Sequence, residues 1–403
     1  MTGSESPNFR QSLWQKRGMR WLFVVTLTVV LLELALSLFF VRNGAFGHWP
    51  LPPFGAITNP AQRTFLERRL ALLDSDNPDT GHGAWDRELG WTNRPSRKRG
   101  EGNYTSNSWA ARGRREYPKR KPAGTTRILC FGDSFTYCEE VDDHETWQHQ
   151  LEQKRGDWEV INFGIGAYGT DQALLRCRRK APGLDPDVVG IGIMLENINR
   201  NVNRYRPIYY PSTRVVAGKP RFVLGGNGLQ LLPLPYATER ALLSAVQDGR
   251  VVEDLRQDEY WIGPRLGLLR HFALGRLAGA YSAYAARRHR DRWLASGEEP
   301  FLVTVALLAA FHREARALGA KLAPILIFPS EKDMAPARLK ERYWRTLTDD
   351  LRARNLPFLD LTEALSAESV GPKKLFRAGH LNARANGLVA AALGDWLESR
   401  LPR

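Results

Sequence analysis

The sequence has few cysteines, three in 403 residues, and no two of them form a C-x-x-C pair. A disulfide scaffold and a zinc ribbon are therefore excluded. No segment repeats at the periods of solenoid proteins. The 35 glycines and 24 prolines are ordinary numbers for this length, which excludes collagen-like and proline-rich chains. With 43% hydrophobic residues, the chain is long enough for one or two globular domains.

Negative charge is also in short supply, since 58 lysines and arginines face 43 acidic residues and leave a net charge of +15. A basic surface attracts nucleic acid, anionic lipid or acidic polysaccharide, and charge alone does not choose among them. No recognisable nucleic-acid module accompanies the charge, so we expect no nucleic-acid partner. His144 and His149 are five positions apart, which does not align them on one helix face, and we assign no metal and no cofactor.

One long hydrophobic run changes the class of the protein. Residues 21–41 carry a single charge, Glu33, and a helix of this length reaches about 30 Å, the thickness of a bilayer core. The run predicts a transmembrane helix. A cleaved signal peptide is the alternative, but its apolar region would be shorter, about 7–15 residues, and only Ala45 stands where an A-x-A site is needed. We therefore favour an uncleaved anchor.

Basic residues before this run predict that the N-terminus is cytoplasmic and the remaining chain extracytoplasmic. These residues are Arg10, Lys16, Arg17 and Arg20. Glu33 is costly where it faces lipid, so a contact with a partner or a protonated state would explain it. The alternative is that a strongly apolar helix tolerates one acid.

The rest of the chain divides into three parts. Residues 1–20 form a cytoplasmic tail, residues 42–123 a tether and lead-in rich in proline and arginine, and residues 124–403 a regular domain. In the domain, short apolar runs alternate with helical patterns, which predicts an α/β fold with a parallel sheet covered on both faces. The predicted strands are 127–131, 159–163, 187–194, 321–328 and 357–360, and the predicted helices are 144–155, 170–180, 302–318, 335–355 and 383–401.

The stretch of about 207–300 breaks this rhythm. We interpret it as an insertion over the carboxyl ends of the strands, where parallel sheets bind ligands.

A serine directly follows the first predicted strand, in the segment G-D-S-F-T. A tight turn there presents the Ser134 hydroxyl at the carboxyl end of the strand, and the helix start aims backbone N–H groups at the same place. This geometry suits a nucleophile that needs an oxyanion hole. The signal is weak by itself, because glycine, aspartate and serine are ordinary turn residues.

Three further segments follow predicted strands or open the last helix. Gly166 and Ala167 lie in the small-residue loop N-F-G-I-G-A-Y-G-T-D, where a backbone N–H can approach a reacting centre. Asn197 lies in L-E-N-I-N, and its amide can donate to a developing oxyanion. His380 lies in G-H-L-N-A at the start of the last predicted helix, where it can act as a general base.

These four blocks, in this order and after these strands, resemble the SGNH/GDSL hydrolase superfamily over residues 127–401. The apolar helix with its internal glutamate, the lead-in N-S-W-A-A-R-G-R-R-E-Y-P and the segment V-D-D-H-E-T-W resemble its membrane-anchored, extracytoplasmic branch. The resemblance implies a three-layer α/β/α, flavodoxin-like sheet. It also implies that Ser134 is the nucleophile and His380 the base. The oxyanion donors would be the Ser134 N–H, the Asn197 side chain and Gly166 or Ala167.

The sequence departs from the family pattern beside the histidine. The family places an aspartate two or three residues before it, and here these positions are Ala378 and Arg377. Three alternatives remain open: a Ser-His dyad oriented by a backbone carbonyl, a substitute acid, or a catalytically dead site. Asp360, at the end of a predicted strand, and Glu363 are the candidates for the substitute acid.

Three functions fit this pattern. The first is an anchored serine esterase that removes acyl groups from a cell-envelope carbohydrate or lipid through an acyl-enzyme. The second is an O-acyltransferase acting on an envelope polysaccharide beside a multipass acyl-donating partner. The third is an inactive glycan-binding protein whose cationic cleft holds an anionic polymer.

Overall fold

The computed structural model describes residues 7–42, 45–46, 49–52, 55–76, 79, 81–100, 104–262, 267–367 and 371–401. The domain has a five-stranded sheet in the order β14-β13-β10-β8-β9, and every pair of neighbouring strands is parallel. Numbered along the chain this is the order 2-1-3-4-5 of flavodoxin-like sheets. The strands are β8 (Thr126–Gly132), β9 (Trp158–Asn162), β10 (Val188–Met194), β13 (Ile325–Phe328) and β14 (Phe358–Asp360). The predicted parallel α/β fold is confirmed.

Helices cover both faces of the sheet and make two separate cores. Side chains of β8 alternate between them: Leu129 and Phe131 enter one core, and Ile128 and Cys130 enter the other. The first core is closed by α5 (Thr170–Lys180), α12 (Glu299–Ala317) and α14 (Arg345–Ala353). The second is closed by α4 (Trp147–Lys154), α15 (Thr362–Ser366) and α16 (Ala383–Glu398). The domain therefore has three layers. Its three cysteines are free and buried.

One predicted helix is divided in two. The pattern over 335–355 predicted a single helix, whereas the structure has α13 (Pro336–Glu341) and α14 with Arg342 between them. Arg342 adopts a left-handed conformation, φ 41°, which ends a right-handed helix. The strand predicted over 321–328 is also shorter and begins at Ile325.

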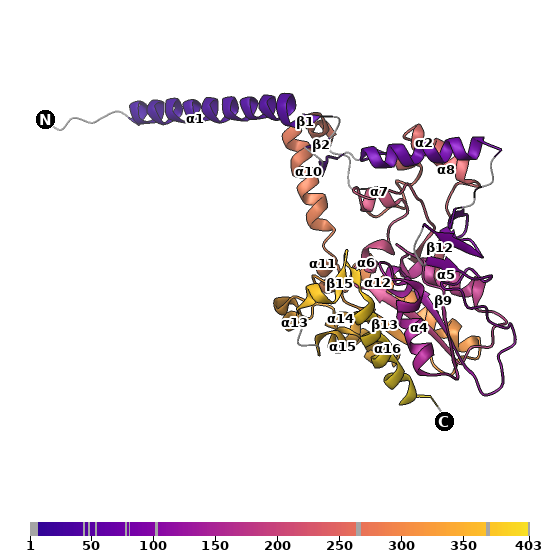
Figure 1. The fold of residues 1–403 in the computed structure, drawn as a ribbon. Coiled ribbons are helices and arrows are strands. Elements are labelled where there is room, and N and C mark those ends of the chain that lie inside the picture. The colour runs from indigo at the N-terminus through magenta and orange to yellow at the C-terminus, as the bar shows by residue number, and fades with distance from the viewer. Residues whose placement is uncertain are drawn as a thin grey trace.

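The N-terminal helix projects away from the domain (Figure 1). It comprises α1 (Pro7–Ala35) and a π-helical turn, η1 (Leu36–Phe40). Its stretch Arg17–Phe40 is 24 residues long, and the most apolar 18-residue window of this stretch has a mean hydropathy of 2.5 and is not buried. This helix is long and apolar enough to cross a membrane, and its exposure sets it apart from a core helix. A signal sequence passes the same test of length and composition.

The expected tether is instead folded onto the domain. The helix α2 (Pro60–Asp74) packs on α8 (Glu239–Gln247), and Arg69 forms an ion pair of 2.6 Å with Glu239. Two hairpins follow, made by β4 (Gly83–Asp86) with β5 (Gly90–Asn93) and by β6 (Arg97–Arg99) with β7 (Tyr104–Ser106). The prolines suggested a tether without regular structure. Pro60, however, is the first residue of α2, where the N–H that proline lacks would have no partner in the helix anyway.

The insertion lies over the segment that follows β10. The indole of Trp261 donates to the carbonyl of Asn199 at 3.0 Å, and that of Trp293 donates to Leu195 at 2.8 Å. The elements here are α6 (Asn197–Arg200), α7 (Arg206–Tyr209), β11 (Arg221–Gly225), β12 (Gly228–Leu232), α8, α9 (Val251–Asp254), η3 (Gly267–His271), α10 (Ala273–Ala286) and α11 (His289–Leu294). The remaining short elements are β1 (Val41–Arg42), β2 (Ala45–Phe46), β3 (Trp49–Pro50), η2 (Asp143–Glu145) and η4 (Pro372–Lys374).

Candidate active site

Ser134 is the first residue of α3 (Ser134–Tyr137), a single turn that directly follows β8. The preceding Asp133 caps this turn, because its side chain accepts a hydrogen bond of 2.8 Å from the Phe135 N–H. Gly132 lets the chain turn here: its φ is +150°, and a Cβ would lie 2.7 Å from the Gly192 carbonyl oxygen on β10. The serine is thus held at the carboxyl end of a central strand, as predicted.

The small-residue loop runs beside this turn. The Ile165 N–H donates to the Gly132 carbonyl at 3.1 Å. A Cβ on Gly164 would lie 2.4 Å from the Tyr137 nitrogen, so only glycine allows the loop to pass so close to α3. The loop then reaches Gly166, whose carbonyl accepts from the Trp91 indole at 3.0 Å. The second block is therefore placed next to the serine turn by backbone contacts.

His380 lies on a hairpin and not at the start of the last helix. The strands β15 (Phe376–Arg377) and β16 (His380–Leu381) pair through a two-residue turn, Ala378 and Gly379, and both turn residues have positive φ. Such a turn matches the twist of a hairpin. The helix α16 begins at Ala383, three residues after His380, with Asn382 as its cap. The hairpin carries the imidazole toward β8 instead of along the helix axis.

The hairpin brings His380 to Ser134 across 246 positions of the chain. The Nε2 atom lies 3.0 Å from the serine Oγ, within hydrogen-bond distance. The ring of Phe135 packs against the imidazole, with 5.4 Å between the ring centres. Two residues that the sequence could only suggest separately therefore lie within the reach that a proton transfer from a nucleophile to a base requires.

The other ring nitrogen of His380 has no partner. Among the described residues, no hydrogen-bonding group contacts Nδ1, although the atom is buried. Burial lowers the pKa of His380, with nearby Glu139 and Asp133 opposing the shift and Arg200 adding to it. A neutral imidazole can accept the serine proton. No carbonyl or carboxylate in the described chain holds the ring from behind.

Neither candidate for the substitute acid serves this role. The Asp360 carboxylate accepts from the Trp344 indole at 2.9 Å and from the Thr362 N–H at 3.0 Å, so both oxygens are used elsewhere. Glu363 is exposed and pairs with Arg342 at 3.2 Å. The structure does not support Asp360 as the substitute acid, because its carboxylate is hydrogen-bonded to the residue that caps α14 and to the start of α15.

Asn197 supplies a buried amide to the site. It is the first residue of α6, just beyond β10, and its buried side chain lies near the Asp133 carboxylate, whose pKa it helps to lower. Neither its Nδ2 nor its Oδ1 makes a hydrogen bond of regular geometry among the described residues. The amide can donate to an oxyanion that forms at this edge of the sheet.

Ala167 occupies a backbone position that favours glycine. Its φ is +65°, within a turn that the Tyr168 N–H closes by donating to the Ile165 carbonyl at 3.4 Å. The resemblance placed a family glycine here, and the positive φ gives the physical reason for it. Which N–H, that of Gly166 or of Ala167, faces the reacting centre stays a prediction.

A charged chain that sequence analysis missed extends from the serine turn. Arg200 lies 3.9 Å from Asp133 and donates to Glu196 at 3.0 Å, and the Tyr209 hydroxyl donates to the same carboxylate. Burial works to raise the pKa of Glu196, but the Arg200 charge and the Tyr209 hydrogen bond outweigh it and lower that pKa to about 2. Burial raises the pKa of Asp133, and Arg200 opposes it. The four-residue spacing of Glu196 and Arg200 was the available signal.

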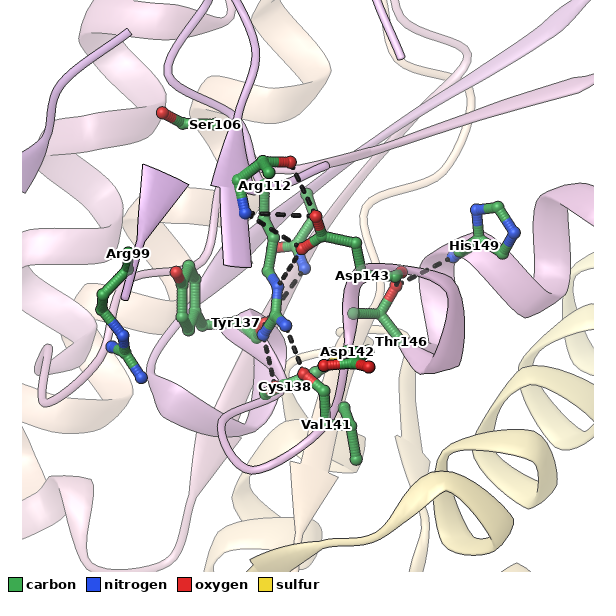
Figure 2. Close-up of polar contacts among 12 residues, drawn as sticks. Arg99, Ser106, Arg112, Tyr137, Cys138, Val141, Asp142, Asp143, Thr146 and His149 are labelled. Carbon is green, nitrogen blue, oxygen red and sulfur yellow. Dashed lines mark hydrogen bonds and ion pairs between the residues drawn. The ribbon is translucent and has the colours of Figure 1, made fainter. Parts of the chain in front are cut away.

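A second missed residue, Arg112, holds the loop after α3 (Figure 2). Its guanidinium donates to the Tyr137 carbonyl at 2.7 Å and also to the carbonyls of Cys138 and Val141. It forms an ion pair of 3.1 Å with Asp143. Asp143 in turn accepts from the Thr105 N–H and hydroxyl. Arg112 and Thr105 of the lead-in thus contact Asp143 of the V-D-D-H-E-T-W segment, next to the loop that follows the serine turn.

The arrangement can carry out acyl transfer. The serine hydroxyl faces a neutral base, and a buried amide and the first N–H of a helical turn lie on the same edge of the sheet. Among the described residues, no carboxylate is hydrogen-bonded to His380, so the arrangement is a Ser-His pair without an orienting acid.

No family model matches the chain, and no curated protein matches it. Solved structures are similar at low identity. A lipolytic protein of the G-D-S-L family from Desulfitobacterium hafniense is 12% identical, over 67% of this chain and 99% of its own, with a TM-score of 0.33. An acetylxylan esterase from Geobacillus stearothermophilus is 14% identical, over 68% and 94%, with a TM-score of 0.33. A lipase/acylhydrolase from Enterococcus faecalis is 14% identical, over 69% and 98%, with a TM-score of 0.35. At these scores they carry no weight for function, which rests on the sequence blocks and the geometry.

Proposed function

We propose that this protein is a membrane-anchored serine esterase of the SGNH type that removes acyl groups from a cell-envelope carbohydrate or lipid. One observation carries the proposal: the Ser134 Oγ and His380 Nε2 lie 3.0 Å apart at the carboxyl edge of the sheet. The four blocks that resemble the SGNH/GDSL superfamily meet at this edge. The apolar stretch Arg17–Phe40 supports the anchor.

The reaction proceeds in two steps. The Ser134 Oγ attacks the ester carbonyl carbon while His380 Nε2 takes the hydroxyl proton, and the carbonyl oxygen becomes an oxyanion. The Ser134 N–H, the Asn197 amide and the N–H of Gly166 or Ala167 stabilise it. The C–O bond to the alcohol then breaks, and His380 returns the proton to the leaving alcohol. Water, deprotonated by His380, attacks the acyl-enzyme, and the acid leaves as Ser134 recovers its proton.

The absence of an orienting acid lowers the turnover that we expect. Removing the orienting acid of a serine triad costs about 10⁴ in turnover, and considerable catalysis over water remains. We therefore expect slow but measurable ester hydrolysis, with acyl-enzyme formation at Ser134.

A fluorophosphonate probe tests the proposal on the full chain in detergent. We expect labelling of the native protein and its loss in Ser134→Ala, with Ser106→Ala as a matched control that keeps the label. Absence of labelling in folded protein at every pH would contradict the proposal. Incubation with an acylated glycan and a free sugar acceptor then separates two reactions: free acid indicates hydrolysis, and acylated acceptor indicates O-acyl transfer, which a multipass acyl donor would supply in the membrane.

The unpartnered Nδ1 of His380 favours a second candidate function, glycan binding without turnover. Arg377, paired with His380 across the hairpin, adds positive charge to the same rim. Equal binding of an acidic polysaccharide by the native protein and by Ser134→Ala, with no ester cleaved by either, would favour this function over the esterase.

A further inference from the structure

Glu33, the one charge in the apolar helix, is used within the chain itself. Its carboxylate accepts from the N–H groups of Ala273 and Leu274, at 2.5 and 2.9 Å, and from the Ser37 hydroxyl at 3.1 Å. Ala273 and Leu274 are the first two residues of α10. A carboxylate at this end of a helix satisfies two free N–H groups and the positive end of the helix dipole. Glu33 therefore fixes the start of α10 against α1.

The segment 267–286, comprising η3 and α10, is unusually apolar and exposed. Outside 17–40, its side chains include the three most exposed large apolar groups in the described chain: Leu268 at 80%, Tyr281 at 71% and Tyr284 at 68%. Among the residues of α10, only Ala273 is buried. A 14-residue helix is too short to span a bilayer, and this one is not a core helix either.

The one charged residue of α10 is turned toward protein. The Arg276 guanidinium donates to the carbonyls of Pro52 and Leu51 at 3.0 and 3.3 Å. Exposed arginines stand at the two ends of the segment, Arg270 in η3 and Arg288 after α10. An apolar helix with aromatic side chains and flanking cations is the pattern of a segment that lies in a membrane interface.

The position of α10 relative to α1 agrees with this pattern. Glu33 precedes Phe40, the end of the apolar stretch, by seven residues, about 10 Å along a helix. Interfacial helices lie about 5–10 Å deep at the boundary of headgroups and acyl chains. In Figure 1, α10 runs crosswise to α1, so it lies along the plane of a membrane that α1 crosses.

We propose that residues 267–286 dock on the phospholipid bilayer that α1 crosses, with η3 and α10 lying in the interface at the C-terminal end of α1. The proposal rests on the anchoring part of the proposed function. It has a consequence for the site, because the end of α10 contacts the Asn197 region: the Asn199 amide donates to the Arg287 carbonyl at 2.8 Å, and Arg287 donates to Ile208 at 2.6 Å. The docked helix holds this side of the candidate site near the membrane surface.

Fluorescence quenching tests the docking on the full chain in vesicles of equimolar phosphatidylcholine and phosphatidylglycerol with brominated acyl chains. The native cysteines are buried, so an environment-sensitive dye attaches to introduced ones. Leu268→Cys and Tyr281→Cys report on the segment, Phe39→Cys on the apolar helix, and Leu231→Cys, on the exposed β11–β12 hairpin, is the negative control. We expect quenching at 39, 268 and 281 at least about threefold above that at 231.

Quenching at 39 with 268 and 281 as low as 231 would overturn the docking and leave the anchor in place; this is the result expected if another membrane protein, and not lipid, covers the segment. No quenching at 39 would remove the anchor and the docking together, without touching the test of Ser134. Glu33→Leu should reduce quenching at 268 about twofold while leaving 39 unchanged, and Glu33→Gln, which keeps an acceptor, should preserve it. Equal quenching at 268 in native and Glu33→Leu protein would show that Glu33 does not set the depth.

Discussion

Ser134 lies on a turn that is fixed by hydrogen bonds on both sides. His380 lies on a short hairpin, and one of its ring nitrogens has no hydrogen-bond partner in the described part of the chain. On the serine side, Asp133 caps the turn. Arg112 donates to three backbone carbonyls at and after the end of α3 and forms an ion pair with Asp143. On the histidine side, Nδ1 contacts no hydrogen-bonding group among the described residues. The candidate nucleophile is thus held in place by several contacts, whereas nothing among the described residues fixes the ring of the candidate base through Nδ1.

This difference separates two requirements of a serine hydrolase. Placing the nucleophile depends on packing of the strand end, and this packing is intact. Orienting the base depends on one carboxylate, and that can be lost with a single residue while the fold is unchanged. Four changes test the two sides independently.

Removing the base should have the largest effect on turnover. We expect His380→Ala to lower kcat for an activated ester by about 10²–10⁴, the usual contribution of a positioned general base. Steady-state kinetics measure this loss, and unchanged thermal unfolding would show that the fold is intact. A variant as active as the native protein would remove His380 from the mechanism.

Introducing an acid before His380 should raise turnover. Ala378 lies two residues before His380 with φ 46°, a conformation that aspartate and asparagine tolerate better than alanine. We expect Ala378→Asp to raise kcat at least tenfold, toward the factor of about 10⁴ that an orienting acid contributes. Ala378→Asn is the matched control, since it suits the turn without charge, and an equal gain from asparagine would point to the turn and not to the acid.

The pH dependence should change in the same experiment. The base works only when neutral, so activity is lost as the pH falls through the pKa of His380. Burial lowers this pKa below its usual 6.5, which places the acid limb of the native profile below that pH. A carboxylate at 378 favours the imidazolium and should move the limb to higher pH. A native limb above 6.5 would contradict the described burial.

On the serine side, Arg112→Ala should destabilise the fold by about 3–5 kcal/mol, because it leaves Asp143 and three carbonyls without their buried partner. Chemical denaturation measures the free energy of unfolding. Arg115→Ala is the control: the Arg115 side chain is 50% exposed in its ion pair with Glu152, against 1% for that of Arg112. Because solvent screens the exposed Arg115 guanidinium, although its partner Glu152 is buried, we expect a smaller loss of stability from Arg115→Ala, and equal losses in the two variants would contradict the role given to Arg112.

The smallest effect on stability is expected in the small-residue loop. Ala167→Gly relieves a positive φ at a turn, and we expect it to stabilise the fold by about 0.5–1 kcal/mol. Thermal unfolding measures the gain. A loss of stability would show that the Ala167 side chain contributes more by packing than its backbone costs.

Much of the fold could be predicted because the signals are local. The apolar runs that became β8, β9 and β10 are bounded by turn residues, and the helix over 170–180 was predicted with the bounds of α5. The break at Arg342 could not be predicted, since no glycine or proline marks it. Nor could the packing of α2 and of the hairpins β4–β5 and β6–β7 on the domain be predicted, because the prolines of this region suggest a linker, whereas Pro60 begins a helix.

The sequence by itself determined where the five strands of the sheet lie, that Ser134 follows a strand end, and that no aspartate stands two or three residues before His380, since each of these depends on neighbouring residues. Only the tertiary structure decided that His380 reaches Ser134 from a hairpin, that Asp360 bonds to Trp344 and Thr362, and that Glu33 caps α10. These contacts join positions more than 200 residues apart or depend on the direction of a side chain. Both follow from how the elements pack on the sheet, which no local pattern of residues encodes.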